Sequence, residues 1–136
     1  MGRHEQREQL FKLLFRVEFN PAEEMPEQVK LFFQDDEVEY TEKVMEAIQA
    51  KYALIQEKLP EIDAMLNEKA EGWNTERMGK VELTVLRIAV YEMLFDEAIP
   101  NTVAINEAIE IAKQYGQAAS GSFVNAVLAK FMNKQD

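Results

Sequence analysis

Apolar residues recur every three or four positions along most of the chain, which is the spacing of one face of an α-helix. A first helix is predicted over residues 3–19, and its apolar face consists of Leu10, Leu13, Leu14 and Val17. An Asn-Pro pair at positions 20–21 ends this helix, because a proline disfavours helical backbone at the residue before it.

Three further helices are predicted before residue 73. Pro26 opens the second helix, and an acidic loop over residues 35–39 follows it. Thr41 caps the third helix, Pro60 separates the third from the fourth, and Gly72 ends the fourth. The apolar positions expected to face inward in these helices are Val29, Phe32, Phe33, Val44, Ile48, Tyr52, Ile55, Ile62, Met65 and Leu66.

The fifth predicted helix, over residues 76–95, is apolar nearly all round, which is typical of a buried central helix. The sixth runs over residues 103–115, with Thr102 as its cap and Gly116 as its stop. The seventh runs over residues 122–133. No strand pattern is found, so the sequence predicts an all-α fold of seven helices in a single domain spanning residues 1–136.

Charge is unevenly spread over the 136 residues, whose formal net charge is −10. Residues 1–20 carry +1, residues 21–72 carry −9 and residues 73–136 carry −2. This balance disfavours loose, charge-driven binding of nucleic acid, so any such site is expected to be local. The chain has no cysteine, no long apolar run and no signal-peptide pattern, and we expect a cytoplasmic protein without a membrane segment.

The sequence offers little for catalysis. His4 is the one histidine, and the chain lacks the Cys, His and Glu-x-x-His patterns of zinc and di-iron sites. The stretch from Gly116 to Gly121 has phosphate-loop spacing but lacks the Lys and Ser/Thr that follow in such loops, and we interpret it as a connection between helices. We therefore expect a protein that is not an enzyme.

Two polar or aromatic features stand out among the apolar helices. Arg87 lies in the middle of the fifth helix, and a buried guanidinium needs a partner. We predict an Arg87–Glu107 ion pair that fixes the docking of the fifth and sixth helices. Phe123, near the start of the last helix, is either core or a stacking platform for a base, since the first-turn amides of a helix attract phosphate.

Three segments together resemble one family. Residues 81–92 (VELTVLRIAVYE), residues 103–113 (VAINEAIEIAK) between Pro100 and Gly116, and residues 123–128 (FVNAVL) are similar to the typical segments of NusB transcription antitermination factors. Arg7-Glu8 followed by Leu14-Phe15 resembles the N-terminal helix of that family. The likeness covers essentially the whole chain in order.

The resemblance implies a fold of two three-helix bundles packed crosswise, plus one extra helix. It also implies a protein without a cofactor that pairs with NusE, a protein of the small ribosomal subunit. The pair is expected to bind the boxA element of nascent ribosomal RNA and to help RNA polymerase resist termination. A homodimer is a further option, because some family members dimerise.

Site residues follow from the same resemblance, position by position. The RNA-binding positions it implies are Arg3, His4, Arg7, Ser120, Ser122 and Phe123. The positions it implies for the contact with NusE are Phe15, Glu76 and Glu82. Basic residues that hold phosphates, aromatic residues that stack on bases, and carboxylates that face a basic ribosomal protein agree with this assignment.

The N-terminal cluster departs from the family pattern, because Glu5 and Gln6 interrupt a run that is often rich in arginine. We therefore expect weak RNA binding by this chain alone and stronger binding with NusE. Two alternatives stay open: a protein-interaction module without RNA binding, and an accessory domain related to those of ribosomal RNA methyltransferases. No cofactor-binding strand-turn-helix follows residue 136, so we expect a free-standing protein.

Overall fold

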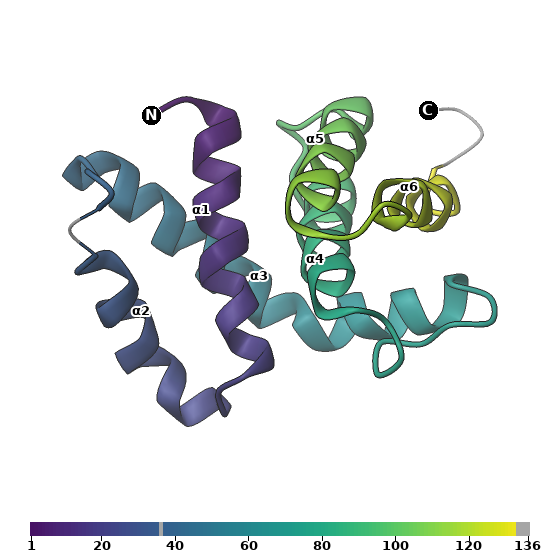
Figure 1. Cartoon of the computed structure of the whole chain (residues 1–136), viewed down its shortest axis with the longest axis horizontal. Coiled ribbons are helices and arrows are strands. Elements are labelled where there is room, and N and C mark those ends of the chain that lie inside the picture. The colour runs from purple at the N-terminus through teal and green to yellow at the C-terminus, as the bar shows by residue number, and fades with distance from the viewer. Residues whose placement is uncertain (36, 133–136) are drawn as a thin grey trace. The chain divides into compact units, whose positions relative to one another are not determined.

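Helices make up the regular structure of the chain, as the apolar spacing predicts. A computed structural model describes residues 1–35 and 37–132. Within these residues there are six α-helices, two short 3-10 helices and no strands (Figure 1). The α-helices are α1 (Arg3–Phe15), α2 (Met25–Phe33), α3 (Glu42–Lys69), α4 (Lys80–Phe95), α5 (Asn101–Tyr115) and α6 (Ser120–Ala129), and the 3-10 helices are η1 (Arg16–Glu18) and η2 (Ala22–Glu24).

The chain divides into two compact units, Met1–Gln56 and Glu57–Asp136. The first unit contains α1, η1, η2, α2 and the N-terminal part of α3. Its core consists of buried apolar side chains from these helices, which are Leu10, Phe11, Leu13, Leu14, Met25, Phe32, Ile48, Tyr52 and Ile55. The predicted single domain over residues 1–136 stays a prediction.

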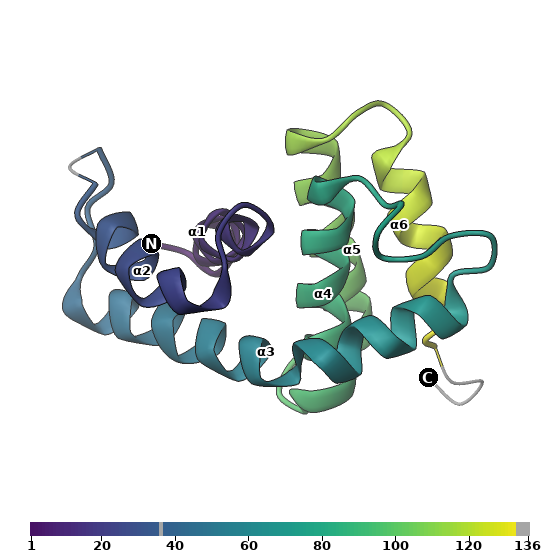
Figure 2. The same ribbon diagram turned by 90° about the horizontal axis from the view of Figure 1, so that it is seen from below.

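In the second unit, α4 is the central helix that the sequence predicts. Every residue from Leu83 to Glu92 is buried, and α4 contacts both α5 and α6. Figure 2 shows α4, α5 and α6 side by side, with the C-terminal part of α3 running across one end of them. An all-round apolar helix is buried because its neighbours cover every face.

Pro60 does not break the third helix, and the prediction of a separate fourth helix is wrong. It lies inside α3, which runs unbroken from Glu42 to Lys69. A proline inside a helix costs about 3 kcal/mol. The fully buried Ile55, Ile62 and Leu66 continue one face across it, and burying such side chains stabilises by roughly 1.5–3 kcal/mol each. Seven predicted helices therefore become six among the described residues.

Several predicted helix ends shift. Helix α1 ends at Phe15 and continues as η1, and Asn20 Nδ2 donates to the carbonyl oxygen of Arg16 at 2.8 Å. Thr41 caps α3 as predicted, because its Oγ1 accepts from the backbone N–H of Val44 at 3.1 Å. Thr102 is not a cap: α5 already begins at Asn101, directly after the extended backbone of Pro100.

The segment between α3 and α4 is longer than predicted, because α4 begins at Lys80 rather than at residue 76. Asn74 Oδ1 accepts from the backbone N–H of Arg77 at 3.0 Å, which folds this stretch into a turn instead of a helix. Helix α6 begins at Ser120, two residues earlier than predicted, and ends at Ala129. The predicted end at Asn133 lies outside the described residues, as does residue 36 of the predicted acidic loop.

Candidate nucleic-acid and partner interface

The elbow between α5 and α6 holds a hydrogen-bonded chain. Ser120 Oγ donates to Glu82 Oε1 at 2.6 Å and accepts from the backbone N–H of Gln117 at 2.8 Å. Ser120 is buried and Glu82 half-buried. Glu82 lies in the first turn of α4, where the helix dipole favours a carboxylate. The structure therefore joins a residue expected to meet RNA to one expected to meet NusE.

Gly116 makes room for this chain. A Cβ at this position would lie 2.5 Å from Ser120 Oγ and 2.7 Å from the carbonyl oxygen of Ala112. Gly116 also ends α5, as the sequence predicts. The close approach of α5 and α6 at the elbow thus depends on the missing side chain.

A shallow cavity of about 190 Å³ lies directly beside the hydrogen-bonded chain. Glu82, Ser120 and Phe123 line it, so three of the predicted site residues share one cavity. The other residues that line it are Trp73, Met78, Gly79, Gln117 and Ala119. All of them belong to the second unit, and we name the cavity and its rim the elbow pocket.

Aromatic and basic side chains form the rim of the elbow pocket. The rings of Trp73 and Phe123 meet edge to face, with their centroids 5.3 Å apart. The guanidinium carbon of Arg77 lies 5.7 Å from the centroid of the Trp73 ring, within the range of a cation–π contact. Trp73 is 46% exposed and Arg77 is exposed. An aromatic pair that is open to solvent beside a cation suits stacking on an unpaired base.

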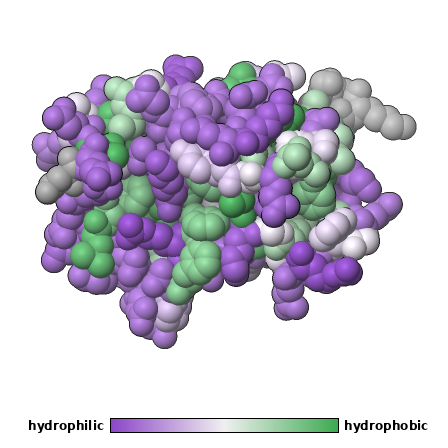
Figure 3. All heavy atoms as spheres, viewed as in Figure 1, coloured by the Kyte–Doolittle hydropathy of each residue, from purple (hydrophilic) through white to green (hydrophobic). Residues whose placement is uncertain are grey.

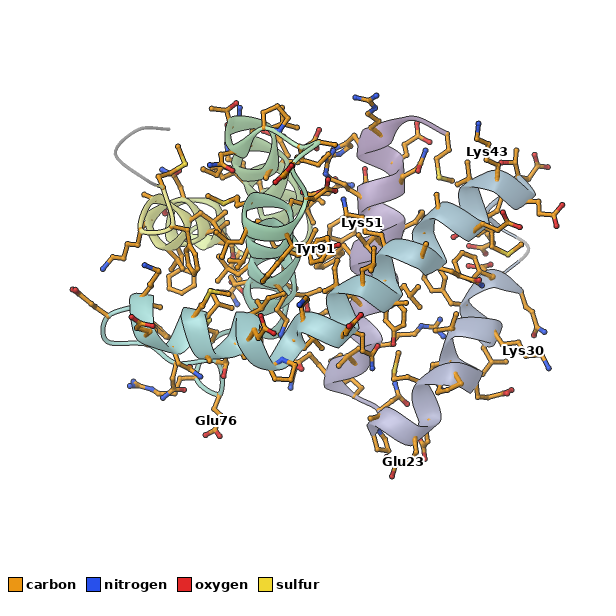
Figure 4. The ribbon with its side chains drawn as sticks, turned by 180° about the vertical axis from the view of Figure 1, so that it is seen from behind. Glu23, Lys30, Lys43, Lys51, Glu76 and Tyr91 are labelled. Atoms are coloured by element: carbon orange, nitrogen blue, oxygen red, sulfur yellow. The ribbon has the colours of Figure 1, made fainter. Side chains whose placement is uncertain are left out.

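Trp73 and Arg77 were not predicted as site residues from the sequence. Their signal was present, because the single tryptophan of the chain follows Gly72 in a polar segment, close to an arginine. The segment was predicted to be partly helical, and a helix over residues 76–95 would not have grouped Arg77 with Trp73. Glu76, in this same segment, is exposed and points outward from it in Figure 4.

The remaining predicted RNA positions differ in exposure. Arg3 is exposed at the start of α1, and His4 Nε2 lies 3.0 Å from Glu8 Oε1. Arg7 is only 7% exposed. Ser122 is exposed, and its Oγ donates to the carbonyl oxygen of Ala119 at 3.1 Å. The RNA contacts of these residues stay predictions.

Phe15 belongs to a row of aromatic rings in the first unit. Its ring centroid lies 5.7 Å from that of Phe11 and 5.1 Å from that of Phe19. Phe11 is buried, Phe15 half-buried and Phe19 59% exposed. The row therefore leads from the core of the first unit to its surface, and the expected contact of Phe15 with NusE stays a prediction.

Arg87 has a partner that the sequence did not predict. Its Nε donates to Asp63 Oδ1 at 2.9 Å and its Nη2 to Asp63 Oδ2 at 2.8 Å, a bidentate pair between α4 and α3. The predicted partner was Glu107 on α5, and the Arg87–Glu107 pair stays a prediction. The unbroken α3 carries Asp63 past α4, whereas a chain broken at Pro60 gave no reason to place it there. Glu107 is half-buried and has contacts of its own.

Other chemistry has no counterpart in the described part of the chain. No group of three or more His, Asp or Glu side chains in residues 1–35 and 37–132 is arranged to hold a metal ion. None of the described helices is long and apolar enough to cross a membrane. The surface seen in Figure 3 is mostly hydrophilic, with small apolar areas among the polar side chains.

Fold and site define a small all-α protein whose second unit carries a pocket rimmed by aromatic and basic side chains. The NusB family model matches residues 4–133, and the chain belongs to the NusB family. The transcription antitermination protein NusB of Agathobacter rectalis is 48% identical over 131 residues, which make up 96% of this chain and 99% of that protein. The family is non-enzymatic, which confirms the prediction that this chain is not an enzyme.

Solved structures of NusB proteins match the fold of this chain. NusB of T. maritima matches with a TM-score of 0.84 and 38% identity, covering 96% of this chain and 89% of that chain. A crystal structure of the antitermination factors NusB and NusE in complex with double-stranded RNA matches with a TM-score of 0.72 and 25% identity, covering 95% and 96% of the two chains. The predicted NusB-like fold is therefore confirmed.

Proposed function

We propose that this chain acts in transcription antitermination by pairing with NusE and binding the boxA element of nascent ribosomal RNA, so that RNA polymerase resists termination. The observation that carries the RNA part of this proposal is the rim of the elbow pocket. There, Trp73 and Phe123 form an aromatic pair beside Arg77. Stacking on such rings is worth about 1–3 kcal/mol for each base. The NusB relative solved with NusE and RNA supports the choice of partners.

Charge explains why the proposal includes a protein partner. The chain carries a formal charge of −10, and the predicted N-terminal cluster is thin: Arg7 is buried and His4 lies against Glu8. Few cations are then left to hold phosphates, and phosphate contacts dominate affinity for nucleic acid. A basic ribosomal protein bound to this chain would supply that positive charge. Glu76, Glu82 and Phe15 are the residues we propose for this contact.

A crosswise packing of two three-helix bundles would bring the N-terminal cluster and the elbow pocket to one RNA-facing surface. We include this packing in the proposal, together with a cytoplasmic location, an antitermination complex on RNA polymerase and the option of a homodimer. The packing is testable by cross-linking a cysteine introduced at Arg3 to RNA that carries a reactive group at its boxA element. If a cysteine at Arg3 and a cysteine at Phe123 both cross-link to the same RNA molecule, the two positions share one RNA-facing surface.

Variants at the rim test the RNA part directly. Trp73→Ala and Arg77→Gln are expected to weaken boxA binding by the complex with NusE, while Lys30→Gln, an exposed lysine on α2, serves as the matched charge control. Fluorescence anisotropy of labelled boxA RNA measures the change. If Arg77→Gln and Lys30→Gln weaken binding equally, general charge rather than the rim holds the RNA.

A variant in the N-terminal cluster distinguishes the proposed function from the alternative, an interaction module that does not bind RNA. Changing Arg3 to Glu should weaken boxA binding and leave the pull-down of NusE intact. An unchanged RNA affinity for both this variant and Trp73→Ala would favour the interaction-only alternative.

A further inference from the structure

The elbow pocket has a carboxylate in its wall, and this group restricts which part of an RNA can enter. Glu82 lines the pocket together with the aromatic side chains of Trp73 and Phe123. Like charges repel, so a carboxylate disfavours a phosphate group, and it accepts hydrogen bonds but donates none. The part of an RNA that fits beside Glu82 is therefore a base edge that carries N–H donors.

One oxygen of this carboxylate is engaged by the protein and the other is available. Oε1 of Glu82 accepts from Ser120 Oγ at 2.6 Å. Within residues 1–35 and 37–132, Oε2 of Glu82 accepts no hydrogen bond. Ser120 is only 2% exposed and is itself fixed, because its Oγ also accepts from the backbone N–H of Gln117. The protein thus holds the carboxylate in one orientation and leaves Oε2 to an outside donor.

Gly79 keeps the space beside Oε2 open. A Cβ at this position would collide with Oε2 of Glu82, and Gly79 also lines the pocket. Its backbone is extended, with φ −60° and ψ 148°, a conformation that any residue adopts. The backbone itself therefore does not require a glycine here. What the missing side chain provides is room next to the available oxygen.

The rest of the pocket suits a stacked base with phosphates on either side. Trp73 and Phe123 meet edge to face, and Trp73 is open to solvent. Arg77 and Lys80 are exposed beside the pocket residues Met78 and Gly79 in the chain, where cations can meet phosphates. The volume of about 190 Å³ lies below the usual range for small-molecule pockets and suits a single base.

The four bases differ in the donors that they can offer to Glu82. Guanine presents N1–H and the N2 amino group side by side, which match the two oxygens of a carboxylate. Adenine and cytosine each present one amino group next to a ring nitrogen that accepts, and uracil presents one N–H between two carbonyl oxygens. These acceptors face the carboxylate unfavourably. Guanine is therefore the base that the wall of the pocket favours.

We propose, on the basis of the RNA-binding function proposed for this chain, that the elbow pocket selects a guanine base of single-stranded RNA. The base stacks against Trp73 and Phe123, and its N1–H and N2 amino group donate to the carboxylate of Glu82. Ser120 orients this carboxylate, and Gly79 leaves room beside it. The base contact is a second role for Glu82, beside the proposed contact with NusE.

Fluorescence of Trp73, the single tryptophan of the sequence, reports on the pocket in the full chain without NusE. The probe is a pentanucleotide of uridines with one central guanosine. In the matched control the central base is hypoxanthine, which lacks only the N2 amino group, and a third RNA has a central adenosine. We expect saturable quenching by the guanosine RNA and about tenfold weaker binding of the control, as the loss of one hydrogen bond to a charged group predicts. The adenosine RNA should bind more weakly still.

Three variants locate the preference. Glu82→Gln replaces the charged acceptor, and the ratio between the affinities for the guanosine RNA and its control should fall below about threefold. Gly79→Ala displaces Oε2 and should lower the same ratio. Glu110→Gln changes an exposed glutamate of α5 that does not line the pocket, and it should leave the ratio unchanged. A ratio is compared because a general change in charge affects both RNAs equally.

Several results would overturn the proposal. Equal affinity of the wild type for the guanosine RNA and its control would do so, as would a preference that persists in Glu82→Gln. Quenching by N-acetyl-lysine methylamide and by none of the RNAs would assign the pocket to a basic side chain of a protein partner. The proposed function fails separately, because boxA binding in the presence of NusE can be absent while the chain alone still prefers the guanosine RNA.

Discussion

Ser120 Oγ lies 2.6 Å from Glu82 Oε1, and this hydrogen bond ties the first turn of α6 to the first turn of α4. A charge-assisted bond of this length is among the stronger hydrogen bonds in proteins. Its two residues were expected to serve different partners, Ser120 the RNA and Glu82 NusE. The hydrogen bond therefore joins the residue proposed to contact RNA to the residue proposed to contact NusE.

Removing the hydroxyl should be costly, because Ser120 is buried and bonded on both sides. Ser120→Ala leaves the Gln117 N–H and the Glu82 carboxylate without this partner, and we expect a loss of about 1–3 kcal/mol in the free energy of unfolding. Urea denaturation of Ser120→Ala, Glu82→Gln and the double variant measures their coupling. A double variant whose loss equals the sum of the single losses would show that the bond contributes no coupling.

The Arg87–Asp63 pair makes a second stability prediction. The Arg87 side chain is 9% exposed and that of Asp63 26% exposed. Breaking a fully buried pair costs about 3–5 kcal/mol, and the partial exposure of Asp63 lowers the expected loss for Asp63→Ala to about 2–3 kcal/mol.

The cycle that pairs Arg87→Met with Asp63→Ala should give a larger coupling energy than the cycle with Glu107→Ala. Thermal and urea denaturation of the three single variants, the two double variants and the wild type supply both energies. A larger coupling of Arg87 with Glu107 would show that Glu107, and not Asp63, is the main partner of Arg87.

Gly116 and Gly72 should tolerate alanine poorly for different reasons. At Gly116 the added Cβ meets the Ala112 carbonyl and Ser120 Oγ, so α5 and α6 must move apart, and we expect a loss of about 1–3 kcal/mol. At Gly72 the space is open, but φ is +79°, where an L side chain is strained by roughly 1–2 kcal/mol. Urea denaturation in a control background distinguishes the clash at Gly116 from the backbone strain at Gly72.

That control is Ser120→Gly, which removes the side chain that a Cβ at Gly116 would meet. Gly116→Ala in this background should lose less stability than in the wild type, whereas Gly72→Ala should lose the same amount in both. Equal losses for Gly116→Ala in the two backgrounds would place its strain on the backbone alone.

Alkaline pH should destabilise the first unit through Tyr52. Burial raises the pKa of its phenol above the ordinary value of 10.0. Above that value the unfolded chain releases the proton first, so the free energy of unfolding falls as the pH rises toward the pKa of the folded state and is unaffected by Tyr52 below it. We expect Tyr52→Phe to reduce this fall above about pH 10.

The free energy of unfolding of the wild type and of Tyr52→Phe is measured across this range. The difference between the two values cancels the titration of the lysines that both proteins share. Tyr40→Phe is an informative companion, because burial and the nearby Asp35 also raise the pKa of Tyr40. Identical pH profiles for the wild type and Tyr52→Phe would contradict the buried, neutral phenol.

The sequence was sufficient to predict that the chain forms helices, but not to predict where they break or which side chains pair between them. Periodicity alone identified α4 as the buried centre, because an all-round apolar stretch has no other stable place. The helix break predicted at Pro60 was wrong, because only the local cost of a proline is visible in the sequence. The burial of Ile62 and Leu66, which offsets this cost, depends on the tertiary fold. The same error hid Asp63 as a partner of Arg87.

The elbow pocket shows the same limit at the level of the site. Ser120, Phe123 and Glu82 were named from the resemblance, but nothing local joins positions 38 residues apart in the chain. Trp73 and Arg77 escaped because the turn made by Asn74 replaces a predicted helix. Side-chain groupings that depend on a turn cannot be obtained from a periodic pattern.

The affinity of boxA RNA for this chain, with and without NusE, tests the proposed function. Fluorescence anisotropy at fixed salt, with a scrambled RNA of equal length as the control, gives both dissociation constants. We predict weak binding by the chain alone, and at least about tenfold tighter and boxA-selective binding when NusE is added. Equal affinity for boxA and scrambled RNA in the presence of NusE would contradict the proposed function.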